Sequence, residues 1–257
     1  MKTLLGCILG IVLLAGVALA TSPEQAGLAV SKRVDSANDG WGSERATLEM
    51  VLVNAHGDRT KRKLSARSIE VDADGDRSLI EFDWPPDVKG TRILTWTHKK
   101  GDDDQWLFLP VMNRVKRISG GNKSGSFMGS EFAYEDLSSH EIEKYKHWLL
   151  GEPKLEARKT WKLQRVPLDT RSGYKRLVVW LDQEYMGPLR IDYYDRKDEL
   201  LKTATFSGYQ KFDAYWRAGS VSMVNHQTKK QSHLTFLQRH LNARLKAQDF
   251  ESDALAE

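Results

Sequence analysis

Closely spaced acidic residues can bind a divalent cation, and one such group occurs in this chain. Asp72, Asp74 and Asp76 form the sequence DADGD, which resembles the opening of a calcium-binding loop. The acidic ligand that closes an EF-hand loop does not follow at the required spacing. We therefore interpret this segment as an Asp/Gly turn.

Histidines recur at seven-residue spacing in two groups, His140/His147 and His226/His233/His240. This spacing places side chains on one face of a helix but on opposite faces of a strand. The second group lies in a strand-like pattern, and two helical turns would separate the first pair. The sequence contains neither a GxSxG elbow nor an HExxH motif. We expect no metal, no cofactor and no enzyme activity.

A loop rich in glycine, serine and asparagine precedes a cluster of apolar residues. Its sequence GGNKSG, residues 120–125, lacks the GxxxxGK[ST] spacing of a phosphate-binding loop. Such a composition does not form a packed element. The chain then returns to the apolar or aromatic residues Phe127, Met128, Phe132 and Tyr134. We predict that these four side chains form a movable gate beside an apolar ligand cavity.

Neighbouring strands supply candidate walls for this cavity. Trp96, Trp106 and Phe108 lie within predicted strands. A single aromatic in such a strand is most often a core residue, but a group of them can also line a site for an apolar ligand. We predict that these three side chains line the cavity wall.

The segment before the glycine loop is basic, with Arg114, Lys116 and Arg117 close together. These side chains either lie on a solvated strand or contact an acidic partner surface or lipid head groups. The whole chain has a formal net charge of +4, with both signs mixed along it. This balance does not indicate nucleic-acid binding, and it permits transient contact with an anionic membrane.

The first twenty residues have the pattern of a secretory signal peptide. Lys2 precedes an apolar run over residues 4–14, and Ala18-Leu19-Ala20 is a small-x-small cleavage site. We predict cleavage after Ala20 and a single domain over residues 21–257, with an uncleaved membrane anchor as the alternative. Cleavage would remove the only cysteine, Cys7, and lower the formal net charge from +4 to +3.

The remaining chain predicts one helix followed by many short strands. Ser22-Pro23-Glu24-Gln25 has the residues of a capping box, and Asn38-Asp39-Gly40 is suited to ending the helix. One or two helical turns are expected within Ser138–Leu150. Strands are expected from Thr47 to about Val53 and over Lys61–Glu70, Ser78–Trp84, Thr91–His98, Gln105–Leu109, Val115–Ile118, Leu155–Val166, Tyr174–Leu181, Leu189–Asp195, Leu200–Tyr209, Val221–Asn225 and Leu234–Arg239. About eleven strands with one helix predict a strongly curved antiparallel sheet with an apolar concave face.

Three segments of the chain resemble the LolA-like family of outer-membrane lipoprotein-sorting proteins. They are WLFLPVMNRVKRI from Trp106, SFMGSEFAYEDL from Ser126 and RIDYYDRKDELLKT from Arg190. The SPEQAGLAV helix and the strand at Val221–Asn225 also fit, so the resemblance covers essentially the whole chain after residue 20. It implies a mainly β fold, a half-open barrel wrapped around a long N-terminal helix and short lid helices. The FMGSEF block implies a branch separate from the housekeeping lipoprotein carrier.

The same resemblance implies a function. It points to a periplasmic, monomeric carrier that binds the acyl chains of a lipid or lipoprotein and works with an RND-type inner-membrane exporter. Two alternatives stay open, namely a periplasmic regulatory module that binds a signalling protein, and a lipid hydrolase. The residues identify neither the cargo nor the direction of transfer.

Overall fold

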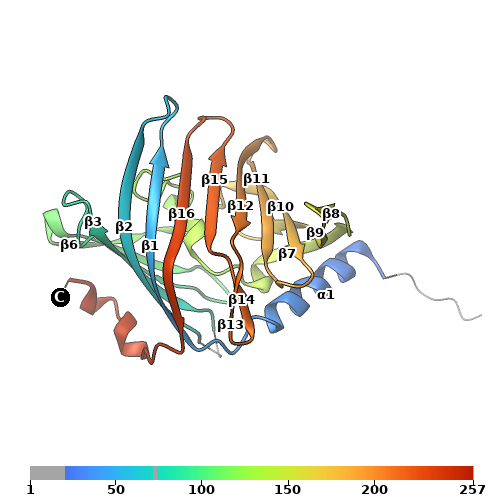
Figure 1. The fold of residues 1–257 in the computed structure, drawn as a ribbon, viewed down its shortest axis with the longest axis horizontal. Coiled ribbons are helices and arrows are strands. Elements are labelled where there is room, and N and C mark those ends of the chain that lie inside the picture. The colour runs from blue at the N-terminus through green and yellow to red at the C-terminus, as the bar shows by residue number, and fades with distance from the viewer. Residues whose placement is uncertain (1–20, 72–73, 257) are drawn as a thin grey trace, which may run out of the picture.

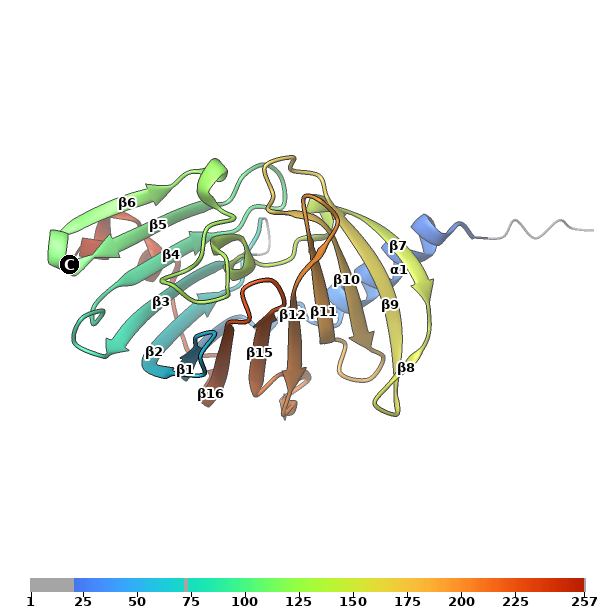
Figure 2. The same cartoon turned by 90° about the horizontal axis from the view of Figure 1, so that it is seen from above.

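A computed structural model describes residues 21–71 and 74–256 of the chain. The predicted signal peptide lies outside the described residues. The described part is mainly β, with one α-helix and one large, strongly curved antiparallel sheet that does not close into a barrel (Figures 1 and 2).

The helix α1, Pro23–Ser36, begins where the sequence predicts. The hydroxyl of Ser22 accepts a hydrogen bond from the Gln25 backbone N–H at 3.2 Å, and the Gln25 side chain accepts one from the Ser22 N–H at 3.2 Å. This reciprocal pair satisfies two N–H groups that the helix start leaves without partners. The helix ends at Ser36, slightly before the predicted stop at Asn38.

The strands form a 14-stranded sheet and a separate two-stranded hairpin, counted over the described residues. The sheet order is β6-β5-β4-β3-β2-β1-β16-β15-β12-β11-β10-β9-β7, with β8 paired to β9, and the hairpin joins β13 to β14. The bounds are β1 (Ser43–Val53), β2 (Arg59–Ile69), β3 (Arg77–Trp84), β4 (Arg92–Trp96), β5 (Asp104–Leu109), β6 (Arg114–Ile118), β7 (Tyr145–Gly151), β8 (Lys154–Leu155), β9 (Arg158–Pro167), β10 (Tyr174–Asp182), β11 (Pro188–Asp195), β12 (Leu200–Ser207), β13 (Gln210–Phe212), β14 (Tyr215–Arg217), β15 (Ser220–Asn225) and β16 (Gln231–Leu241).

Of the one or two helical turns expected within 138–150, one is present, and the strand that follows it was not expected. A short 3-10 turn spans Ile142–Lys144, and Tyr145–Gly151 is the edge strand β7, paired with β9. The alternation of buried and exposed residues that marks a strand is hard to see in this segment, because a polar residue, His147, is buried. Its ring is hydrogen-bonded to Ser31 at 2.8 Å. α1 packs closely on β7, where a side chain at Gly27 would meet the β7 backbone at 2.7 Å.

Apolar side chains cover both faces of the strands near the β6 edge. Ile93 faces the concave side and belongs to the main core, whereas its neighbour Leu94 faces the convex side. The C-terminal segment, residues 243–256, covers that convex face and contributes Phe250 and Leu255 to a second core (Figure 2). Trp96 fixes this segment, because its indole N–H donates to the Phe250 carbonyl at 2.7 Å.

Candidate functional site: an apolar cavity beside a hairpin plug

The concave face of the sheet encloses an apolar cavity of about 520 Å³. This volume lies within the range of cavities that bind small ligands. Its walls come from the sheet, from α1 and from residues 126–137, which we call the plug. The apolar side chains that line it are Val34, Leu48, Met50, Leu64, Ala66, Ile80, Phe127, Phe132, Leu137, Ile142, Val179, Leu181, Met186, Pro188, Ile191, Ala204, Phe206, Trp216, Ala218, Val221, Met223, Leu234 and Phe236.

Strand register explains the apolar wall. Val179, Ile191, Ala204 and Met223 are successive partners across β10, β11, β12 and β15, so their side chains lie side by side in one row. All four are buried. Side chains on one face of a sheet repeat every second residue, so the regular antiparallel pairing presents a continuous apolar strip to the cavity.

The plug is a tight hairpin. Ser126 and Ala133 form an isolated β-bridge, and the Phe127 N–H donates to the Phe132 carbonyl at 2.7 Å. Its tip has positive φ at Met128 (48°) and at Gly129 (75°). A left-handed backbone favours glycine, so Met128 carries a modest conformational cost at this turn.

A buried ion pair anchors the plug to the sheet. Lys202 on β12 donates to Asp136 at 2.6 Å and to the Glu131 carbonyl at 2.8 Å. The Tyr174 hydroxyl donates to the second oxygen of Asp136 at 2.8 Å. The Lys202 and Asp136 side chains are each 4% exposed. Buried charges are tolerated when they are paired and hydrogen-bonded, as these are.

Polar side chains on other strands fix the rest of the plug. Arg62 on β2 donates to the Met128 carbonyl at 2.6 Å, and Gln105 on β5 donates to the Tyr134 carbonyl at 2.9 Å. The side chain of Glu131 accepts from Asn225 on β15 at 2.7 Å. Strands on both sides of the cavity therefore contact the plug through hydrogen bonds.

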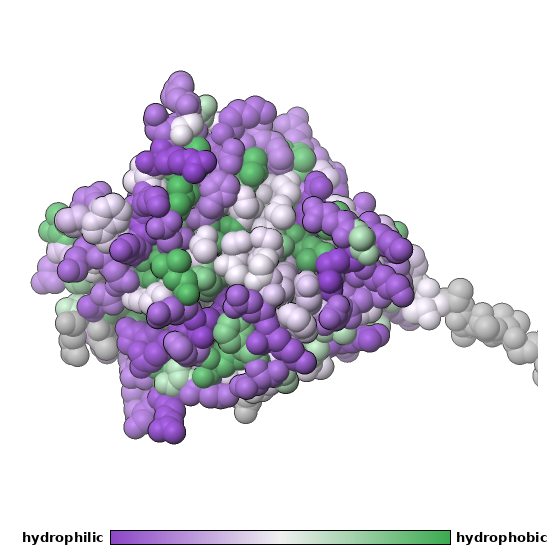
Figure 3. Space-filling model, viewed as in Figure 1, coloured by the Kyte–Doolittle hydropathy of each residue, from purple (hydrophilic) through white to green (hydrophobic). Residues whose placement is uncertain are grey.

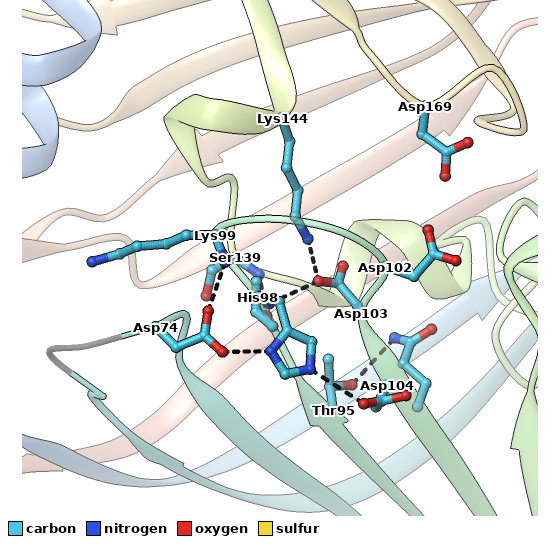
Figure 4. Close-up of polar contacts among 12 residues, drawn as sticks. Asp74, Thr95, His98, Lys99, Asp102, Asp103, Asp104, Ser139, Lys144 and Asp169 are labelled. Carbon is cyan, nitrogen blue, oxygen red and sulfur yellow. Dashed lines mark hydrogen bonds and ion pairs between the residues drawn. The ribbon is translucent and has the colours of Figure 1, made fainter.

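Ion pairs also join the two ends of the open sheet. Asp103, in the turn between β4 and β5, pairs with Lys144, which directly precedes β7. Asp102 in the same turn pairs with Arg171 in the turn between β9 and β10. Figure 4 shows Asp102 and Asp103 on this turn, with Lys144 reaching Asp103 from the opposite side. We call these two pairs the clasp.

His98 holds the clasp turn in place. Its ring contacts Asp74 and Asp104, and its backbone N–H donates to Asp103 at 3.0 Å (Figure 4). Burial lowers the pKa of His98, but the hydrogen bonds with the two aspartates outweigh this effect and raise the pKa above its ordinary value. The His98 ring is therefore held more firmly when it is protonated.

Comparison with known proteins gives the family. A family model described as "Uncharacterized protein" matches residues 74–257. A structure described as an outer membrane lipoprotein-sorting protein domain from Vibrio parahaemolyticus is 46% identical with a TM-score of 0.89, and the match covers 91% of this chain and 100% of that chain. A DUF1329 family protein from Desulfovibrio piger is 30% identical with a TM-score of 0.87, covering 91% and 100%.

The chain belongs to the LolA-like family. A LolA superfamily protein from Nitrosomonas europaea shares the fold, with 17% identity and a TM-score of 0.71 over 89% of this chain and 98% of that chain. No curated protein matches the chain. The predicted family and fold class are thus confirmed.

Half of the predicted gate lies at the cavity of this LolA-like chain. Phe127 and Phe132 line it, and Phe127 also packs on Phe82 with ring centroids 5.6 Å apart. Met128 and Tyr134 pack against the same core without lining the cavity, and Tyr134 meets the Phe127 ring edge-on at 5.9 Å.

The predicted wall residues lie elsewhere. Trp96, Trp106 and Phe108 belong to the convex cluster beneath the C-terminal segment. The cavity instead faces their strand neighbours, since a shift of one residue moves every side chain to the other face. Both faces of β4 and β5 are apolar, so the sequence pattern does not show which residues of these strands face the cavity and which face the convex side.

The predicted basic segment forms the edge strand β6. Arg114 and Lys116 are exposed, and Arg117 pairs with Asp104. The preceding turn exposes Val111 (90%) and Met112 (60%). Elsewhere, on the face shown in Figure 3, hydrophilic side chains predominate and apolar ones appear in separate patches. Within residues 21–71 and 74–256, no helix is long and apolar enough to cross a membrane.

Sequence reasoning missed the polar residues that organise the cavity, Lys202, Asp136 and Arg165. The position of Lys202 could have been recognised from the sequence. It lies two residues before the buried Ala204 on β12, so both side chains are on the core-facing side of the strand. A lysine at such a position requires a buried partner.

Proposed function

We propose that this LolA-like chain is a periplasmic carrier that holds acyl chains in the cavity and passes them between envelope membranes. The supporting observation is the apolar cavity of about 520 Å³ under the curved sheet, lined by the Val179–Ile191–Ala204–Met223 row. The description of the Vibrio parahaemolyticus relative as an outer membrane lipoprotein-sorting domain agrees with cargo that carries acyl chains.

The energetics suit a carrier. Each methylene group transferred from water to an apolar site contributes about 0.8 kcal/mol, so a single long chain gains on the order of 10 kcal/mol before the costs of binding. Phe127 and Phe132 would contact the chain from the plug side. Release requires an acceptor that buries the same chain, which a membrane or a receptor provides.

We propose that the turn between β5 and β6 contacts the membrane. Val111 and Met112 are exposed there beside Arg114 and Lys116. Apolar side chains that insert at the head-group level, together with basic residues near anionic lipids, give reversible surface binding. We propose that the carrier works as a monomer and receives or delivers its cargo at this turn, with an RND-type exporter as its inner-membrane partner.

Filling the cavity tests the carrier proposal. Ala204→Leu and Ala66→Leu each add a larger apolar side chain to the cavity wall from different strands. We expect both variants to bind a fluorescent long-chain fatty acid at least about 10-fold more weakly, because the chain and the new side chain compete for the same space. Ala55→Leu on the exposed β1–β2 turn is the matched control. Unchanged binding by both folded cavity variants would contradict the proposal.

A further inference from the structure

Arg165 on β9 brings a cation to the end of the apolar cavity. It lines the cavity and pairs in register with His147 and Leu177, in a row that continues through Tyr193 and Lys202. This row is two residues along the strands from the apolar row. The cavity therefore has an apolar wall that ends in a polar one.

The guanidinium of Arg165 has no protein partner among the described residues. Its Nε is buried without a hydrogen-bond acceptor. The other two arginines that line the cavity are bonded: Arg217 donates to the Asn38 side chain at 2.8 Å, and Arg239 donates to Glu44 at 3.0 Å. Burial without a partner lowers the pKa of Arg165, as expected for a desolvated cation.

The groups near Arg165 are the ring of His140, the hydroxyls of Tyr145 and Tyr193, and two carboxylates, Asp35 and the Lys202-paired Asp136. Burial, followed by the nearby Arg165 charge, lowers the pKa of His140 to about 4, so its ring is neutral at pH 7. The hydroxyls of Tyr145 and Tyr193 are neutral as well, since burial raises both pKa values. The carboxylate of Asp35 faces the cavity from α1 without an ion pair to Arg165 in the described structure, and burial raises its pKa.

We propose that the cavity binds an acyl chain that ends in one compact oxyanion, a carboxylate or a phosphate, with Arg165 as the counter-ion. The proposal rests on the carrier function and specifies its ligand. Arginine matches both oxyanions with two parallel N–H donors, and such charged hydrogen bonds are roughly twice as strong as neutral ones. The acyl groups of a lipoprotein anchor are attached through neutral ester and amide bonds, so they would leave Arg165 unpaired. The preferred cargo is therefore an anionic lipid.

The test compares three ligands with the same chain: hexadecanoate, hexadecyl phosphate and hexadecanol. Their affinities are measured by displacement of a fluorescent probe from wild-type protein and from Arg165→Met and Arg165→Lys. We expect at least one oxyanion to bind wild type about 10- to 100-fold more tightly than the alcohol, because a charged hydrogen bond is worth that factor. Arg165→Met should lose this preference and keep its affinity for hexadecanol, and Arg165→Lys should retain part of the preference.

The outcomes separate the two proposals. Equal wild-type binding of all three ligands, or an equal loss of all three in Arg165→Met with an unchanged melting temperature, would overturn the role of Arg165. Failure of wild type to bind any of them would overturn the carrier function itself. With the preference present, tighter binding of hexadecanoate identifies a fatty acid as the ligand class, and tighter binding of hexadecyl phosphate identifies a lipid with a terminal phosphate.

Discussion

Lys202 Nζ lies 2.6 Å from a carboxylate oxygen of Asp136, and the two residues, 66 positions apart in the sequence, are almost completely buried. The pair joins β12 of the sheet to the plug. It also lies beside Tyr193, whose ring centroid is 5.2 Å from the ammonium group. This charge pair thus joins the plug of this LolA-like protein to the sheet. Removing either residue would leave the other charge buried without its partner.

Breaking this pair from one side should be costly. Lys202→Met leaves the Asp136 carboxylate buried with two neutral donors, the Tyr174 hydroxyl and the Ala133 N–H. We expect a loss of about 3–5 kcal/mol in the free energy of unfolding, measured by urea denaturation at pH 7. The double variant Lys202→Met/Asp136→Leu should lose less than the sum of the single variants by more than about 1 kcal/mol. Strict additivity would show that the two groups do not depend on each other.

Two buried carboxyl groups, Asp76 and Glu141, should each make a contribution to stability that falls as the pH rises from 5 to 8, whereas the lowered pKa of His140 acts in the opposite direction. Burial, with the Glu70 charge second, raises the pKa of Asp76 from 3.8 to about 6, and burial with nearby aspartates raises that of Glu141 from 4.5 to about 7. An acid whose folded pKa is raised stabilises the fold below its unfolded pKa and loses that contribution as the pH rises through the folded one. His98 acts in the same direction, because its raised pKa gives stability that is full below 6.5.

Two neutral variants isolate this effect. Asp76→Asn and Glu141→Gln should each raise the free energy of unfolding at pH 8, relative to that at pH 5, by about 1 kcal/mol compared with wild type, after allowance for partial solvent screening. Chemical denaturation at the two pH values measures this directly. A pH profile that both variants leave unaltered would rule out these carboxyl groups as its cause.

The clasp should open with salt. Asp103 and Lys144 are about one-fifth exposed (21% and 20%), so their pair contributes about 0.2–1 kcal/mol and is screened at high ionic strength. We expect Asp103→Asn to speed amide hydrogen exchange in the β4–β5 turn about 2- to 5-fold at low salt, and much less in molar salt. Arg59→Gln, at the exposed start of β2, is the control. Equal acceleration at both salt concentrations would mean that the pair is not electrostatic in origin.

The convex cluster should support stability without affecting ligand binding. Phe108 is 6% exposed beneath the C-terminal segment, so Phe108→Ala should cost about 3–5 kcal/mol. Fatty-acid affinity of the folded fraction should stay within about twofold of wild type, whereas Met223→Ala in the cavity should change it. A large affinity loss in folded Phe108→Ala would place this face in the binding mechanism after all.

The sequence predicts the elements better than their faces. The capping residues Ser22 and Gln25 act locally, so the start of α1 follows from four consecutive residues. Ile93 and Leu94 are adjacent on β4 and both are fully buried. The alternation of apolar and polar residues therefore does not predict which of the two faces the cavity. Only the C-terminal segment, more than a hundred residues further along the chain, decides it.

The polar part of the site is harder to predict for the same reason. Arg165 stands next to Gln164 on a strand whose pattern gives no sign of a cavity. Arg165 is covered by β7, α1 and residues 138–142, which contact it only in the folded chain. Lys202 and Asp136 meet only because the plug packs on β12, a long-range contact that spacing along the chain does not encode.

The central claim is that the cavity holds an acyl chain, and native mass spectrometry tests it most directly. Wild type and Ala204→Leu would be expressed with the full chain, purified from cell envelopes without detergent, and analysed before and after lipid extraction. We predict a one-to-one complex of wild type with an acidic lipid, and a largely empty Ala204→Leu variant. Wild type that carries no lipid and takes up neither hexadecanoate nor hexadecanol would contradict the account.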